Sequence, residues 1–136
     1  MSSFNERIIE EFRANAGRVG GPFAGGDLLL LHTTGARSRT ERVTPLAYAR
    51  DGEDLVVAAS KAGAPTNPDW YANITANRDV EVEVGSQRIP MRATVHTDGP
   101  VRERLYGLIV DKMPGFAEYQ RRTTRTIPVV TLRPIR

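Results

Sequence analysis

Alternating apolar and polar residues predict several of the strands in this chain. Val80, Val82 and Val84 alternate with two glutamates, and apolar residues from Ile89 to Val95 alternate with polar residues and a proline. A period of two is typical of a strand with one face in a core. The other strand candidates are short segments rich in apolar residues: 28–33, 42–50, 55–60 and 127–132. The pattern therefore predicts about six strands.

Turn residues indicate how these strands connect. Asp51-Gly52 and Gly85-Ser86 each join two strand candidates over the short distance of a hairpin. Pro45 has no N–H to donate, so its strand is expected at a sheet edge or broken at that point. Successive hairpins form an antiparallel sheet, and six curled strands favour closure into a barrel. We therefore expect an α+β, mainly β protein: a barrel of about six mostly antiparallel strands with flanking helices.

A helical pattern opens the chain. Ser3 and Glu6 have the spacing of a capping box, and we expect a helix over residues 4–16, followed by a Gly-rich loop at 20–26. Its apolar stripe favours packing against the core or an oligomer interface. Peripheral membrane contact is the alternative, although the polar face is as acidic as it is basic.

Two further helices are predicted among the later strands. Asn67 suits an N-cap and Pro68 suits the first helical position, which predicts a helix that ends near Asn77. Another helix follows Asp98, with an apolar stripe of Val101, Leu105, Leu108, Ile109 and Met113. A short aromatic segment comes after it at 116–120. Because no linker or repeat interrupts the chain, we expect residues 1–136 to form one domain, in which 1–26 supply the N-terminal helix and loop.

Composition and charge narrow the function classes. The 136 residues are 40% hydrophobic and 26% charged, as in an ordinary globular domain. The absence of cysteine excludes disulfides, thiolate metal ligands and a cysteine nucleophile. His32 and His96 are far apart in sequence, so no metal site is expected, and His32 is expected to be packed or hydrogen-bonded. A net charge of +3 favours an anionic partner.

The location of the protein is predicted from what its apolar segments can do. The apolar runs are too short for a helix that crosses a membrane. The first residues lack the basic and apolar regions of a secretory signal. We therefore expect a cytoplasmic protein, with membrane association through the N-terminal helix as the alternative.

Two loops at strand ends carry the candidate chemistry. The first loop (residues 33–42) contains Thr-Thr-Gly-Ala-Arg-Ser, and the second loop (residues 60–67) begins Ser-Lys-Ala-Gly. Phosphate oxygens accept hydrogen bonds from hydroxyls, cationic side chains and backbone N–H groups; the first loop offers all three, and the second adds a cation and a glycine at another strand end. Neither has the spacing of a Walker A or G-x-G-x-x-G motif. The residues alone thus predict an anion site if the loops converge, and otherwise a solvated basic hairpin tip.

The blocks within and between these loops resemble the deazaflavin-dependent nitroreductase family. They read Leu-His-Thr-Thr-Gly-Ala-Arg-Ser, Arg-Val-Thr-Pro-Leu from Arg42, Ala-Ser-Lys-Ala-Gly from Ala59 and Asn-Pro-Asp-Trp-Tyr-Ala-Asn from Asn67. The resemblance extends from about Phe23 to Pro134. It implies a split β-barrel related to flavin reductases. It also implies binding of coenzyme F420, an anionic 8-hydroxy-5-deazaflavin, and hydride transfer from its reduced form to a quinone or nitroaromatic acceptor.

The resemblance also implies which residues hold the coenzyme. Its phosphate and anionic tail would contact Arg37, Ser38, Arg42 and Lys61, with backbone from Ala62 and Gly63. Its ring would lie near Pro45, Leu46, Ser60, Asn67, Trp70 and Tyr71. This chain has Arg39 where the family usually has glycine. A side chain there is expected to alter the loop, and the extra cation is expected to favour a longer anionic tail.

The expected reaction needs little acid–base machinery, because the coenzyme carries the hydride. No Ser-His-Asp set or carboxylate pair stands out in the sequence. Phe116 and Tyr119, and less strongly Tyr106, are candidates to cover the acceptor, and packing of a short helix is their alternative role. The Tyr119 hydroxyl is a catalytic candidate because it could donate to the oxyanion that forms on the acceptor.

Other functions remain open from the sequence. Split barrels also bind FMN, and a carrier that only binds the deazaflavin would need the same loops. Nucleic-acid binding is not expected, because no strand carries clustered aromatics among its basic residues. The remaining expected partners are a small-molecule electron acceptor and a second copy of the chain in a homodimer.

Overall fold

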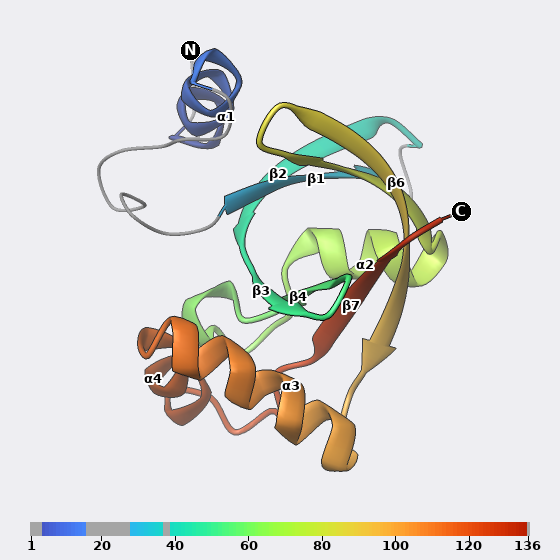
Figure 1. Cartoon of the computed structure of the whole chain (residues 1–136). Coiled ribbons are helices and arrows are strands. Elements are labelled where there is room, and N and C mark those ends of the chain that lie inside the picture. The colour runs from blue at the N-terminus through green and yellow to red at the C-terminus, as the bar shows by residue number, and fades with distance from the viewer. Residues whose placement is uncertain (1–3, 16–27, 37–38, 136) are drawn as a thin grey trace.

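The computed structural model describes residues 4–15, 28–36 and 39–135 (Figure 1). Its elements are, in chain order, α1 (Phe4–Ala14), β1 (Leu28–Thr34), β2 (Glu41–Ala47), β3 (Ala49–Asp51), β4 (Asp54–Ala58), the short 3₁₀ turn η2 (Lys61–Gly63), α2 (Asp69–Ala76), β5 (Asp79–Val84), β6 (Gln87–His96), α3 (Gly99–Lys112), α4 (Gly115–Arg121) and β7 (Val129–Pro134).

The strands in the described residues form one antiparallel sheet with the order β2-β1-β5-β6-β7-β4-β3. β2 and β3 are the two edges of this order, yet only Tyr48 separates them in sequence. The sheet must therefore curl until its edges meet, and Figure 1 shows this curl. The prediction of a split β-barrel is confirmed.

The strand count exceeds the predicted six because the expected strand 42–50 is broken. It divides at Tyr48 into β2 and β3, so the described part of the chain has seven strands. Tyr48 lies where the chain passes from one sheet edge to the other; it is 4% exposed and belongs to the core cluster inside the barrel. Pro45 lies in β2, opposite Leu30 of β1, which confirms the edge position predicted from its missing N–H.

Both faces of β1 are buried, which explains its continuous apolar run. Leu29 and Leu31 belong to the core inside the barrel, whereas Leu28 and Leu30 pack against Ile8 and Phe12 of α1. The apolar stripe of α1 therefore packs against the outer face of β1 and β2. A third cluster lies between the sheet and α3, on the opposite side from α1 (Figure 1). The helices thus cover two outer faces of the barrel.

Two details of the predicted helices differ from the structure: the end of α1 and the buried stripe of α3. α1 ends at Ala14 rather than 16, and Ser3 and the 20–26 loop lie outside the described residues. The buried stripe of α3 consists of Arg102, Leu105, Tyr106 and Ile109, whereas Val101, predicted to be buried, is 49% exposed. No helix in the described ranges is long and apolar enough to span a membrane.

The prediction of Asn67 as the N-cap of α2 is wrong. The helix begins at Asp69, Pro68 occupies the N-cap position, and no side chain caps the helix. The Asn67 side chain is engaged elsewhere, because its Oδ1 accepts a hydrogen bond of 2.8 Å from Nη1 of Arg125. A contact with a residue 58 positions away has replaced the local capping interaction.

Candidate functional site

The first loop is fixed at its base by Asn73 of α2. Asn73 is 8% exposed, and its Oδ1 accepts the Ala36 N–H at 3.0 Å while its Nδ2 donates to Thr33 Oγ1 at 3.2 Å. The backbone closes the loop with Gly35 N–H to Thr40 O at 2.8 Å and Arg39 N–H to Gly35 O at 2.9 Å. The second loop leads into the first turn of α2. Both loops are therefore attached to the same short helix.

Arg39 adopts a conformation that favours glycine. Its φ is +58°, in the left-handed region where an L-residue costs about 1–2 kcal/mol. This gives a physical reason why glycine suits the position and why the arginine is a departure. The Arg39 N–H still closes the loop, so the turn tolerates the side chain. Arg37 and Ser38, the two candidate residues before it, lie outside the described residues.

Arg42 lies beside the base of the first loop. It is opposite Thr33 in the β1–β2 register, and paired residues project from the same face of a sheet. Leu46 is on that face and packs against the barrel core. Pro45 has the opposite parity, on the side where Val43 packs against α1. The structure therefore places Arg42 and Leu46 on the same face of β2 and turns the Pro45 ring to the opposite face.

The second loop contains consecutive left-handed residues. Ser60 is right-handed (φ −80°, ψ −38°), and Lys61, Ala62 and Gly63 follow with φ of +46°, +54° and +82°. A right-handed residue followed by a left-handed one directs successive backbone N–H groups into a concavity that binds anions. Two of the three left-handed residues are not glycine, so this geometry costs free energy that other contacts must supply.

Arg125 holds the second loop. Its Nη2 donates to the carbonyl oxygens of Ala59 at 3.2 Å and Ser60 at 3.0 Å. Its Nε donates to Ala64 O at 3.0 Å, in addition to the Asn67 contact. Arg125 is not among the residues predicted from the sequence. In the sequence, Arg125 is recognisable only as an arginine shortly before the last predicted strand, and that feature is too common to mark a functional residue.

Close packing against α4 also fixes Gly63. A Cβ on this residue would lie 2.7 Å from the Tyr119 carbonyl oxygen and 2.8 Å from Arg122 Cβ. α4 therefore lies directly beside the candidate anion-binding loop. Phe116 and Tyr119 of α4 are half-buried and form an edge-to-face pair with ring centroids 5.0 Å apart. The structure brings these two aromatic candidates close to the second loop.

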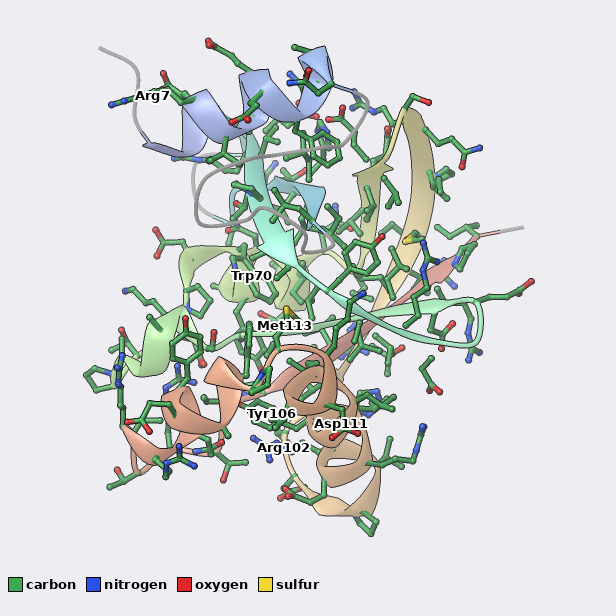
Figure 2. The ribbon with its side chains drawn as sticks, turned by 60° about the vertical axis from the view of Figure 1, so that its left-hand side comes forward. Arg7, Trp70, Arg102, Tyr106, Asp111 and Met113 are labelled. Carbon is green, nitrogen blue, oxygen red and sulfur yellow. The ribbon has the colours of Figure 1, made fainter. Side chains whose placement is uncertain are left out.

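Tyr106 is placed differently from the other aromatic candidates. It is 6% exposed, its hydroxyl donates to the Phe116 carbonyl oxygen, and Arg102 Cζ lies 4.4 Å from its ring centroid (Figure 2). Burial raises the pKa of its hydroxyl. Tyr106 thus supports the backbone at the start of α4 and lies with the α3 core.

Trp70 and Tyr71 begin α2 on the barrel side of the loops. Trp70 is 5% exposed within the barrel core, and Tyr71 is half-buried at its margin with its ring edge-on to Trp70 at 6.5 Å. Ser60 is 8% exposed, whereas Lys61 is exposed and its Nζ lies 3.4 Å from Thr66 Oγ1. Three candidate ring residues, Ser60, Trp70 and Tyr71, are therefore more buried than the candidate cations Arg42 and Lys61, whereas the ring candidate Asn67 is exposed.

His32 belongs to a separate cluster under α1. It is 4% exposed, and its Nε2 lies 2.5 Å from Glu83 Oε2, which also pairs with Arg13 Nη2 at 2.7 Å. The hydrogen bonds from Arg13, and secondarily from His32, lower the Glu83 pKa to about 2. His32 is packed and hydrogen-bonded, as expected. Among the described residues, no group of three or more His, Cys, Asp or Glu side chains is arranged to hold a metal ion.

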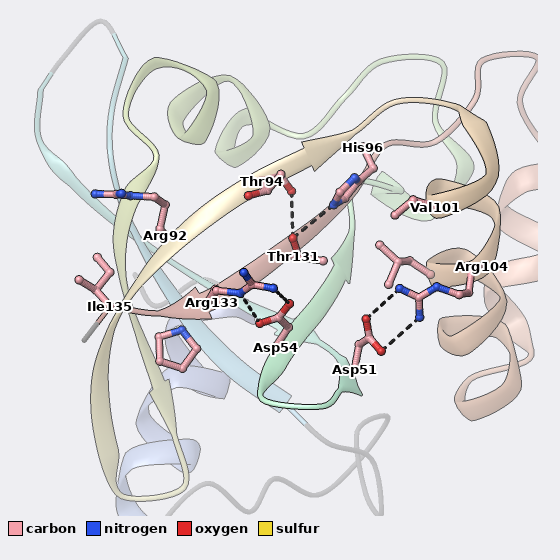
Figure 3. Close-up of a pocket in the computed structure, with 12 residues that line it drawn as sticks. Asp51, Asp54, Arg92, Thr94, His96, Val101, Arg104, Thr131, Arg133 and Ile135 are labelled. Atoms are coloured by element: carbon pink, nitrogen blue, oxygen red, sulfur yellow. Dashed lines mark hydrogen bonds and ion pairs between the residues drawn. The ribbon is translucent and has the colours of Figure 1, made fainter.

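A hollow of about 630 Å³ lies on the outer side of the sheet, between α3 and strands β4, β6 and β7 (Figure 3). Its charged groups are held in ion pairs: Arg104 with Asp51, Arg133 with Asp54, and Arg92 with Asp79, which lies outside the hollow. His96 lies 3.3 Å from Thr131 Oγ1. None of the candidate residues from the two loops lines this hollow.

Comparisons with known proteins agree with the fold and the motif blocks. A family model described as F420H(2)-dependent quinone reductase matches residues 6–134. An F420H(2)-dependent quinone reductase of Mycobacterium tuberculosis (strain ATCC 25618 / H37Rv) is 43% identical over 124 residues, which cover 89% of this chain and 83% of the relative.

Two solved structures are also similar. One, described as an F420-H2 dependent reductase (FDR-A), is 38% identical with a TM-score of 0.71 and covers 77% of this chain and 92% of that chain. Another, described as a domain-swapped dimer, is 34% identical with a TM-score of 0.73 and covers 93% of this chain and 92% of that chain. The family match and these likenesses place the chain in one group of oxidoreductases with a split-barrel fold: it belongs to the F420H2-dependent quinone reductase family.

Proposed function

We propose that this chain transfers a hydride from reduced coenzyme F420 to a quinone, a nitroaromatic or a similar small acceptor. The observation that carries the proposal is the second loop, whose anion-binding backbone at Ser60 to Gly63 packs directly against the backbone of α4, the helix that carries the aromatic pair Phe116 and Tyr119. A coenzyme with a phosphate and a flat ring suits such a loop beside an apolar surface. When bound, the coenzyme supplies the hydride.

In this proposal the cations and the loop backbone hold the phosphate and tail. Lys61 and Arg42 would supply side-chain charge, and the backbone around Ala62 and Gly63 would line the phosphate, with the Gly63 N–H itself engaged by Ser60 O at 2.9 Å. Arg37 and Ser38 are assigned to the same role from the sequence. The attachment of both loops to α2 supports this grouping, because it fixes their bases on one helix.

The ring would lie towards the barrel, near Leu46, Ser60, Trp70 and Tyr71. The burial of Ser60 and Trp70 beside exposed Lys61 supports this direction. Pro45 would contribute through its backbone, because its ring faces α1. Asn67 would contribute through its Nδ2, because its Oδ1 is engaged by Arg125.

Tyr119 is the proposed catalytic residue, and Phe116 covers the acceptor beside it. A phenol hydroxyl beside the acceptor would donate to the oxyanion that develops as hydride arrives. Tyr106 is assigned a supporting part, because its hydroxyl holds the Phe116 carbonyl. Holding the acceptor against the coenzyme ring supplies much of the acceleration in a reaction of this kind.

The proposal is tested by steady-state oxidation of reduced F420 in the presence of a quinone. Catalysed oxidation that saturates with quinone would support it. Tight F420 binding without turnover would instead identify a carrier, and tight binding of FMN with no F420 binding would identify a flavin enzyme. The Arg39 departure is tested by comparing Kd for F420 with short and long tails. A length preference that is lost in Arg39→Gly supports a role for this cation in tail binding, and an unchanged preference removes it.

The remaining expectations concern the assembly and its surroundings. We treat residues 1–136 as one domain, because α1 and α3 pack against the same sheet. A homodimer is supported by the similar structure described as a domain-swapped dimer, and light scattering on the purified protein tests it. We propose a cytoplasmic location, because the coenzyme must be reduced again between turnovers. Peripheral membrane contact through α1 would have to use its charged face, since Ile8 and Phe12 are buried, and vesicle sedimentation tests it.

A further inference from the structure

The conformation of the second loop is not explained by its own sequence. Lys61 and Ala62 are left-handed without being glycine. Two short backbone bonds, Gly63 N–H to Ser60 O at 2.9 Å and Ala64 N–H to Lys61 O at 3.0 Å, close the turn. Such a turn would relax if nothing outside it held the chain, so the concavity at Ser60–Lys61 depends on contacts from other elements.

Arg125 supplies these contacts on both sides of the left-handed residues. Its guanidinium reaches the carbonyls of Ala59 and Ser60 before them and of Ala64 after them. A planar guanidinium has five N–H donors in a fixed fork, so it can bind several carbonyls at once where a lysine ammonium cannot match the geometry. Arg125 therefore fixes both ends of the turn relative to each other.

The charge of Arg125 is not neutralised by a carboxylate. Its side chain donates to three carbonyl oxygens and to the Asn67 amide oxygen, and no ion pair joins it to an acidic residue of the described ranges. Its positive charge therefore adds to the field of the loop. An anion in the concavity at Ser60–Lys61 would be attracted by it.

Arg125 is itself held by Gln120 of α4. Gln120 Nε2 donates to the Arg125 carbonyl at 2.7 Å, and its Oε1 accepts from the Ile127 N–H at 3.0 Å and from Arg102 Nη2 at 2.6 Å. The chain of hydrogen bonds runs from buried Arg102 in α3, through α4, to the second loop. The loop and the helix that carries the aromatic pair are thus fixed by one network.

We propose that Arg125 is the positioning residue for the coenzyme phosphate. It holds the second loop in its anion-binding conformation and adds an unpaired positive charge beneath it. This inference rests on the proposed function, since it assigns the anion at this loop to the phosphate of F420. It follows that loss of Arg125 weakens the phosphate-dependent part of coenzyme binding and leaves the ring-dependent part intact.

The test compares two ligands by fluorescence titration: F420, and the same 8-hydroxy-5-deazaflavin without its phosphate and tail. The variants are Arg125→Gln, which removes the charge, and Arg125→Lys, which keeps it but loses the fork. Arg121→Gln is the matched control, because Arg121 is an exposed arginine at the end of α4, four residues before Arg125, and pairs with Glu118. We expect Kd for F420 to rise at least 10-fold in Arg125→Gln and at least 3-fold in Arg125→Lys. Kd for the phosphate-free compound should change less than 2-fold.

The outcomes separate this inference from the proposed function. Wild-type protein that binds neither ligand overturns both. If wild-type protein binds F420 but the Arg125 variants bind it equally well, the inference alone is overturned. An equal loss for both ligands would also overturn it, because that result means general damage to the site. Hydrogen exchange gives a ligand-free check: the Gly63 and Ala64 amides should exchange faster in Arg125→Gln while β7 amides keep their protection, and uniform loss of protection would overturn the inference.

Discussion

Replacing Arg39 with glycine should stabilise the protein. Arg39 has φ of +58°, where an L-residue costs about 1–2 kcal/mol. Glycine avoids this cost but loses about 0.5–1 kcal/mol through the greater freedom of its unfolded chain. The backbone bonds that Arg39 and Gly35 make with the loop do not involve the side chain, so they persist. The expected net gain in the free energy of unfolding is about 0.5–1 kcal/mol.

Thermal unfolding measures this gain. For a chain of 136 residues, a change of this size raises Tm by about 2–4 °C. Ser86→Gly is the matched control, because Ser86 is an exposed turn residue without positive φ, and there glycine should be neutral or destabilising. A lower Tm for Arg39→Gly than for wild type would refute the reasoning. It would mean that the Arg39 side chain makes contacts worth more than the strain of its backbone.

Three further predictions follow from the site and from the α1 face. Gly63→Ala should lower the free energy of unfolding by about 2–4 kcal/mol and abolish F420 binding. The added Cβ would lie 2.7 Å from the Tyr119 carbonyl oxygen, and the φ of +82° disfavours alanine. Urea unfolding measures the loss of stability, and an unfolding midpoint equal to that of the wild type would contradict it. Tyr119→Phe should slow single-turnover hydride transfer at least 10-fold with Kd for F420 unchanged, and an unchanged rate would remove its hydroxyl from the mechanism. The Glu83 pKa is lowered from 4.5 to about 2, so its ion pair stabilises the fold above about pH 4.5 and this contribution is lost as the pH falls towards 2.

The pH dependence has a defined size and control. A shift from 4.5 to about 2 corresponds to about 3 kcal/mol at full strength. Solvent screening of half-exposed Arg13 reduces this to about 1–2 kcal/mol. The free energy of unfolding, measured from pH 6 to pH 3, should therefore fall less steeply with decreasing pH in Glu83→Gln than in the wild type. Asp79→Asn is the control, because Asp79 is an exposed carboxylate on the same strand, and equal slopes for Glu83→Gln and wild type would contradict the assignment.

Local patterns were sufficient to predict most of the strands and helices. The alternation at Val80 to Val84 and the turn at Asp51-Gly52 each depend on neighbours in sequence, and both appear where they were expected. The break at Tyr48 was not predictable, because it arises from the need to curl the sheet until its edges meet. The position of that corner depends on the whole sheet, and no feature of the residues beside Tyr48 marks it.

The candidate site was less predictable, because long-range contacts position it. Asn67 has a good capping sequence, but the bond to Arg125 replaces the cap. Asn73 looked like an ordinary helix residue, yet it fixes the base of the first loop. The left-handed conformation of Lys61 and Ala62 had no signal, because neither residue is glycine. The residue types thus indicated which two loops could bind an anion. The long-range contacts that fix the conformation of these loops became visible only in the folded structure.

The most direct test of the account is an equilibrium titration of the purified protein with F420 and with FMN, followed by absorbance and fluorescence. The account predicts saturable binding of F420, one per chain, with weaker binding of FMN. Lys61→Ala should weaken F420 binding at least 5-fold. Tighter binding of FMN than of F420, or F420 binding unaffected by Lys61→Ala and Arg42→Ala together, would contradict the central claim that these two loops hold a deazaflavin coenzyme.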